Sequence, residues 1–135
     1  MLNFACAWAR LDALPEELCR LSRLHTLDIS FNALAAVPDA IGELKSLRSL
    51  LLQQNSLESL PAALSLCAKL ELLDAAANNL SALPASMGSL QRLSTLLLDG
   101  NRHDPTNWGK KERSSCPCFQ HHWTDNRAAH DGSWF

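Results

Sequence analysis

Leucine recurs along this chain in a pattern that repeats every 23 residues. The unit spanning residues 47–69 reads LxxLxLxxNxLxxLPxxLxxCxx. Leu50 and Leu52 alternate with outward positions, which predicts a short strand whose leucines point inward. The proline then fixes φ near −65° and starts a return segment. In that segment Leu64 and Cys67 are three residues apart, which predicts a short helical or 3₁₀ turn with one buried face.

Three residue types keep this period along the chain. Leucine opens successive units, asparagine takes the ninth position and proline the fifteenth. The leucines are Leu24, Leu47, Leu70 and Leu93; the asparagines are Asn32, Asn55, Asn78 and Asn101; the prolines are Pro15, Pro38, Pro61 and Pro84. Since a fixed period indicates stacked structural units, we predict repeats at 1–23, 24–46, 47–69 and 70–92, and a fifth that begins at 93. The four asparagines should lie above one another where the strands end, and their amides should satisfy backbone groups of the neighbouring turn.

The pattern resembles the leucine-rich-repeat family, in the short LPxxL variety of intracellular Ras-group scaffold proteins. The resemblance covers residues 1–101. It implies an α/β solenoid, an arc with short parallel strands on the concave side and short helical or 3₁₀ segments on the convex side. We expect about 4.5 repeats in residues 1–101, each stabilised by its neighbours.

The pattern stops after Asn101. Residues 102–135 contain no leucine, isoleucine or valine, but they hold three of the four tryptophans and four of the five histidines. We expect an irregular, disordered C-terminal tail over 102–135. The chain starts inside an in-register repeat, so both ends look cut.

Composition narrows the function. The chain has 135 residues, is 47% hydrophobic and has a net charge of −2. We therefore expect one folded domain and no electrostatic attraction to nucleic acid or an anionic membrane. The sequence contains no apolar run long enough to span a membrane and no signal-peptide pattern. Five cysteines without a regular framework favour a cytoplasmic location.

By the resemblance, the third, fifth, seventh and eighth positions of each repeat form an exposed concave face on the strands. These twenty positions include three aspartates and no lysine or arginine. Large apolar side chains stand among acids and amides there, a mixture that suits a protein partner. The candidate partner-binding residues are Trp8, Phe31, Asp28, Leu51, Gln53, Leu72, Asp74, Leu97 and Asp99. The alternative is that these residues reflect strand propensity alone.

The basic residues gather at the junctions between repeats. They are Arg20, Arg23, Lys45, Arg48, Lys69 and Arg92. We interpret them as a solvated rim that keeps the solenoid soluble, rather than as a site for phosphate or an acidic partner.

Other chemistry has little support. The tail contains zinc-type ligands, Cys116, Cys118, His121, His122 and His130, but Cys-Pro-Cys is tighter than the usual ligand spacing, so we predict no metal site. No phosphate loop, HExxH or G-x-S-x-G motif is present. We expect no enzyme activity and no cofactor. Cys19 is expected at an exposed helical position.

Two functional hypotheses remain open. The favoured one is a protein-protein interaction module that binds through the concave face, and the resemblance implies a signalling scaffold with small GTPase pathways among its settings. The alternative is a truncated fragment of a larger repeat protein, without independent function. A complete module should unfold cooperatively as a monomer, whereas a fragment with bare ends should aggregate or melt gradually.

Overall fold

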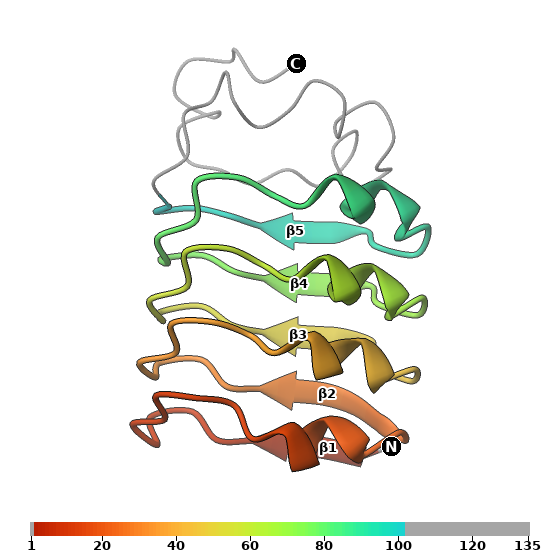
Figure 1. Ribbon diagram of the computed structural model, residues 1–135, viewed down its shortest axis with the longest axis horizontal. Coiled ribbons are helices and arrows are strands. Elements are labelled where there is room, and N and C mark those ends of the chain that lie inside the picture. Colours follow the sequence, from red (N-terminus) through yellow and green to blue (C-terminus); the bar gives the residue numbers. More distant parts are fainter. Residues whose placement is uncertain (1, 102–135) are drawn as a thin grey trace.

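The computed structural model describes residues 2–101 and shows a solenoid of five parallel strands alternating with four 3₁₀ helices. The strands are β1 (Leu2–Ala5), β2 (Leu24–Asp28), β3 (Ser49–Leu51), β4 (Leu72–Asp74) and β5 (Thr95–Leu97). The helices are η1 (Glu16–Arg20), η2 (Asp39–Glu43), η3 (Ala62–Leu66) and η4 (Ala85–Ser89). Figure 1 shows the strands stacked in one column and the helices stacked in a second column in front of them. The predicted fold class is confirmed.

The strands pair in sequence order, β1 to β5, and the pairing keeps the 23-residue register. Leu27 is opposite Leu50, Leu50 is opposite Leu73, and Leu73 is opposite Leu96. Because successive side chains of a strand point to opposite faces, this register puts all leucines of the fourth position into one buried column. Each of these four leucines has no exposed surface.

The 3₁₀ helices form where the prolines predicted a return segment. Pro61 precedes η3 with φ −72°, and the N–H of Leu64 donates to its carbonyl at 3.1 Å. The N–H of Cys67 then donates to the carbonyl of Leu64 at 3.1 Å, which is the three-residue step of a 3₁₀ helix. Leu64 and Cys67 are both buried, as are Met87 and Leu90 in the next repeat, so the predicted inward face of the return segment is confirmed.

Cys19 is buried, contrary to the exposed position expected from the sequence. It lies on η1, which contacts η2 along the stack of helices. The equivalent residue of η2 is Gly42, where an added Cβ would lie 2.7 Å from the carbonyl oxygen of Ala63. Adjacent helices therefore approach closely at this position, which is covered by the next repeat rather than by solvent. Burial raises the pKa of the Cys19 thiol, and the charges of Glu43 and Glu16 add to the effect.

The asparagines at the ninth position of the repeats form a column, and their side chains hydrogen-bond neighbouring turns to one another. The N–H of Leu57 donates to Oδ1 of Asn78 at 3.1 Å, while Nδ2 of Asn78 donates to the carbonyls of Leu52 at 3.0 Å and Ala75 at 3.1 Å. One side chain thus satisfies backbone groups of its own repeat and of the preceding one. Asn32, Asn55 and Asn101 make the same kind of contacts.

The predicted tail over 102–135 lies outside the described residues, as do its candidate metal ligands. The division of the chain at residue 101 stays a prediction. Within residues 2–101, no helix has the length and hydrophobicity that a bilayer crossing requires.

Candidate binding surface

The outward side chains of the sheet form an ordered row on the concave face. At the fifth position of successive repeats, Asp28 of β2 is opposite Leu51 of β3. Leu51 is opposite Asp74 of β4, and Asp74 is opposite Leu97 of β5. The row therefore alternates acid, leucine, acid, leucine across four hydrogen-bonded strands. We call it the Asp/Leu row.

The leucines of this face are half-buried. Leu51, Leu72 and Leu97 lie between neighbouring outward side chains of the sheet and keep part of their surface in solvent. Sequence reasoning placed them as exposed groups. Their partial burial follows from strand spacing: side chains directly across two neighbouring strands are close enough to cover one another.

The seventh and eighth positions of each repeat lie beyond the strand ends, which corrects their placement on the strand surface. The eighth position has a left-handed backbone. Trp8, Phe31, Gln54 and Ala77 have φ between 53° and 63°, and Gly100 has φ 74°. The chain therefore makes a left-handed turn at this position in every described repeat. The backbone hydrogen bonds between adjacent repeats still extend to the eighth position, since the N–H of Gln54 donates to the carbonyl of Ala76 at 3.0 Å. The side chains of this column stand at the rim of the sheet.

Two aromatic rings stack at this rim. The ring centroids of Trp8 and Phe31 are 4.2 Å apart and the ring planes differ by 14°. Phe31 is half-buried, whereas 72% of the Trp8 surface is exposed. The pair offers a rigid aromatic surface beside the row.

The carboxylates of the face are held in place by short local hydrogen bonds. Oδ1 of Asp28 accepts from the hydroxyl of Ser30 at 2.6 Å and from its N–H at 3.1 Å. Oδ1 of Asp74 accepts from the N–H of Ala76 at 3.1 Å. Burial raises the pKa of Asp74; the Ala76 hydrogen bond opposes this, and the charges of Asp99 and Asp28 add to the rise. The charges of Asp99 and Asp28 therefore act on Asp74.

Gln53 lies at the seventh position, just beyond the end of β3, and Ser30 and Ala76 occupy this position in the neighbouring repeats. Its Oε1 is buried and accepts no hydrogen bond within the described part of the chain. A buried amide oxygen without a partner is costly.

The basic residues are placed away from this face, at the junctions between repeats. All six of them are exposed, as the rim interpretation expects. Arg48 lies 3.9 Å from Glu71, and the two side chains are 46% and 50% exposed. Such exposed pairs contribute little to stability.

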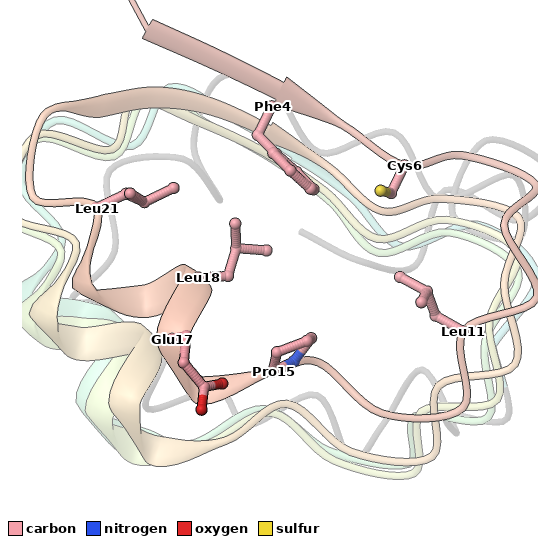
Figure 2. Close-up of a pocket in the computed structure, with 7 residues that line it drawn as sticks. All are labelled: Phe4, Cys6, Leu11, Pro15, Glu17, Leu18 and Leu21. Atoms are coloured by element: carbon pink, nitrogen blue, oxygen red, sulfur yellow. The ribbon is translucent and has the colours of Figure 1, made fainter.

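A hollow that the sequence did not indicate opens at the N-terminal end of the solenoid. It has a volume of about 360 Å³. Figure 2 shows side chains of the β1 segment facing side chains of the η1 segment across it. Its lining consists of Phe4, Cys6, Leu11, Pro15, Glu17, Leu18 and Leu21. All of these residues except Pro15 and Glu17 occupy columns that form the core of later repeats, so the hollow is the uncovered end of the core rather than a separate site.

Within residues 2–101, no group of three or more metal-binding side chains comes together. The candidate residues of the concave face, by contrast, do come together: the Asp/Leu row, Gln53, Leu72 and Asp99 on the sheet and its exits, with the aromatic pair at the rim.

Comparison with known proteins also identifies leucine-rich repeats in this chain. A family model described as leucine rich repeat matches residues 22–80. A leucine-rich repeat and calponin homology domain-containing protein of Drosophila melanogaster is 55% identical over 49 residues, which are 36% of this chain and 6% of the fly protein.

Solved structures share the fold. The ectodomain of the Arabidopsis thaliana receptor kinase GASSHO1/SCHENGEN3, in complex with CASPARIAN STRIP INTEGRITY FACTOR 2, is 30% identical with a TM-score of 0.69, over 76% of this chain and 13% of that one. A leucine-rich-repeat protein of Leptospira interrogans is 25% identical with a TM-score of 0.74, over 92% and 37%. The Arabidopsis BIR3–SERK2 complex contains a chain that is 34% identical with a TM-score of 0.62, over 68% and 51%. The chain thus spans about half or less of each of these proteins.

Proposed function

We propose that this chain, whose repeats match the leucine-rich-repeat family model, is a protein-binding module whose partner docks on the concave face. Its fold typically serves protein-protein interaction, and two of the similar structures are complexes: the GASSHO1/SCHENGEN3 ectodomain with CASPARIAN STRIP INTEGRITY FACTOR 2, and BIR3 with SERK2. The observation that carries the proposal is the composition of the concave face. Leu51, Leu72 and Leu97 keep exposed surface there beside fixed carboxylates, and Trp8 is mostly exposed.

The physical argument is one of burial. A partner that covers these side chains removes apolar surface from water, at roughly 25 cal/mol per Å². Aromatic and leucine side chains in the centre of a patch, with polar groups around them, are the arrangement in which few residues supply most of the binding energy. The strands beneath are rigid, so little conformational entropy is lost when the partner binds.

The proposal extends to the setting of the protein. We propose that it binds without catalysis of its own, as a scaffold in cytoplasmic signalling, with small GTPase pathways among the settings that the family resemblance suggests. The location rests on the cysteine pattern of the sequence, which has no regular disulfide framework. A fluorescent fusion of the whole chain tests the location, and accumulation in the secretory pathway would contradict it.

The binding surface is tested with two double variants of equal chemistry. Leu51→Arg with Asp74→Lys alters the concave face. Leu66→Arg with Asp39→Lys makes the same changes at exposed positions of η3 and η2, where Leu66 is 55% exposed. Each chain is immobilised, and the proteins that it retains from a cell extract are quantified by mass spectrometry.

We expect the first variant to lose the retained partner and the second to keep it, with melting temperatures close to that of the wild type in both. Equal retention by the two variants would show that the concave face is not the binding surface.

A further inference from the structure

The spacing of the Asp/Leu row specifies what kind of partner surface fits it. Neighbouring strands of a sheet lie about 4.8 Å apart, so a partner that runs across the strands meets Asp28, Leu51, Asp74 and Leu97 at steps of about 4.8 Å. The two carboxylates are thus separated by about 10 Å, and so are the two leucines.

An α-helix repeats with nearly this step. Residues three to four apart lie on one face, and at a rise of 1.5 Å per residue they are about 5 Å apart along the axis. Residues seven apart are separated by about 10.5 Å. An extended peptide places side chains of one face about 6.7 Å apart. This spacing does not match the step of about 4.8 Å in the row, so only its first side chain would be in register. The row therefore matches a helix and not a strand.

Most residues beside the row are short, and Leu72 and Gln53 are the larger ones among them. On one side, Thr26, Ser49 and Thr95 occupy three of the four third positions, and on the other, Ser30 and Ala76 occupy two of the seventh positions. These side chains are short. A helix can approach until its side chains contact the row.

The charges of the face indicate that the partner helix carries basic residues. The twenty outward positions include Asp28, Asp74 and Asp99 and no cation. Burial is the main reason that the pKa of Asp74 is raised, and the charges of Asp99 and Asp28 add to it, so a cation placed among these carboxylates favours their charged form. Hydrogen bonds from lysine or arginine to carboxylates are also the stronger kind.

We propose that the partner presents a basic amphipathic α-helix that lies along the Asp/Leu row, with lysine or arginine at positions i and i+7 and apolar residues at i+4 and i+11. The basic residues contact Asp28 and Asp74, and the apolar residues contact Leu51 and Leu97. This inference rests on the proposed function and adds the chemistry of the partner to it.

The test uses three synthetic 18-residue helical peptides that differ only at these four positions. One carries Lys, Leu, Lys, Leu; the second has the same composition in the order Lys, Lys, Leu, Leu; the third carries Glu, Leu, Glu, Leu. Dissociation constants for the whole 135-residue chain are measured by fluorescence anisotropy of labelled peptides. We expect the first peptide to bind at least about 10-fold more tightly than either of the others, and its affinity to fall as salt is added.

The matched variant is Asp28→Asn with Asp74→Asn. Asparagine keeps the Oδ1 acceptor for the bonds from Ser30 and Ala76, so the fold is preserved while the charge is removed. We expect the preference for lysine over glutamate to fall to about 1-fold in this variant. The preference should remain in the control Asp39→Asn, at an exposed position of η2.

Equal binding of the first two peptides, a preference that survives in the Asp28→Asn, Asp74→Asn variant, or no binding of any peptide would each overturn the inference. In those cases the proposed function still stands if Leu51→Arg with Asp74→Lys abolishes partner capture. Both the proposed function and the helix inference fail if the Leu51→Arg, Asp74→Lys variant captures the partner as well as the wild type does.

Discussion

The indole of Trp8 stacks on the ring of Phe31, with centroids 4.2 Å apart and planes 14° from parallel. Both residues have a left-handed backbone, with φ 63° and 56°. For L-residues this conformation costs roughly 1–2 kcal/mol, and it is unusual for bulky side chains. The same conformation occurs at the eighth position of every described repeat, so the left-handed backbone belongs to the turn, and the exposed aromatic stack is what distinguishes the first two repeats.

The substitution Trp8→Gly separates the contribution of this side chain to stability from its contribution to partner binding. Glycine adopts the left-handed conformation freely, so the strain is relieved while the stacking, worth about 0.5–1.5 kcal/mol, is lost. We expect the free energy of unfolding to change by less than about 1 kcal/mol, and the affinity for the partner to fall by about 10-fold or more. Urea unfolding and a binding titration measure the two effects. Gln54→Gly, in the same column, is the control, and an equal loss of affinity in it would contradict a special role of the aromatic pair.

The left-handed turn predicts opposite effects at two neighbouring positions. Gly100 has φ 74°, and a Cβ there would lie 3.4 Å from Cα of Ala77, so Gly100→Ala is opposed by backbone conformation more than by space. We expect it to lower stability by about 1 kcal/mol. Ala77→Gly, at φ 53°, should raise stability by a few tenths of a kcal/mol, because relief of strain slightly exceeds the added entropy of the unfolded chain. Chemical denaturation of both variants checks the signs; a stabilised Gly100→Ala would refute the turn.

The asparagine column should be important for stability. Asn78 is 5% exposed and hydrogen-bonds to Leu57, Leu52 and Ala75. Asn78→Ala leaves buried backbone groups without partners, at a cost of about 2–4 kcal/mol in total. Thermal and urea unfolding measure the loss. Ser81→Ala, at an exposed position of the same repeat, should change stability by less than about 0.5 kcal/mol.

Asp74 predicts a pH dependence of definite sign. Its pKa is raised above the ordinary 3.8, first by burial and then by the charges of Asp99 and Asp28, against the lowering effect of the Ala76 hydrogen bond. The folded protein therefore binds this proton more tightly than the unfolded chain does. Its contribution to stability increases as pH falls through the raised folded pKa towards 3.8, and it is lost as pH rises.

Asp74→Asn removes this dependence and keeps the Oδ1 acceptor. We expect the variant to be more stable than the wild type at pH 7, with a difference that shrinks as pH approaches 4. Denaturant midpoints over pH 4–7 give the difference. A variant that is less stable at pH 7, or a difference that does not change with pH, would show that the carboxylate is not strained in the folded state.

The sequence predicts the parts of this fold that every repeat shares. Leu50 and Asn55 occupy environments that recur unchanged in each unit, so the residue type recurs as well. The left-handed eighth position could not be read in this way. Its column runs Trp, Phe, Gln, Ala, Gly, and only Gly100 signals the conformation. There the backbone is set by the turn and by the ladder to the next repeat, not by the residue.

The burial of a residue that depends on contact with a neighbouring repeat could not be predicted from the sequence either. Cys19 is buried because η2 packs on η1, and nothing in its own repeat indicates this. Phe4 and Leu18 match columns that are buried elsewhere, yet they line the hollow at the N-terminal end. The residues of the concave face could be named from the sequence, but the alternation of the Asp/Leu row follows from strand register.

The claim that the partner binds the concave face is tested most directly by photocrosslinking. A benzophenone amino acid is placed at position 51 in one chain and at position 66 in another, one on the concave face and one on η3, and both are irradiated with the captured partner. The account predicts a crosslinked partner from position 51 and little or none from position 66. Crosslinking from position 66 with none from position 51 would contradict it and place the binding surface on the side of the helices.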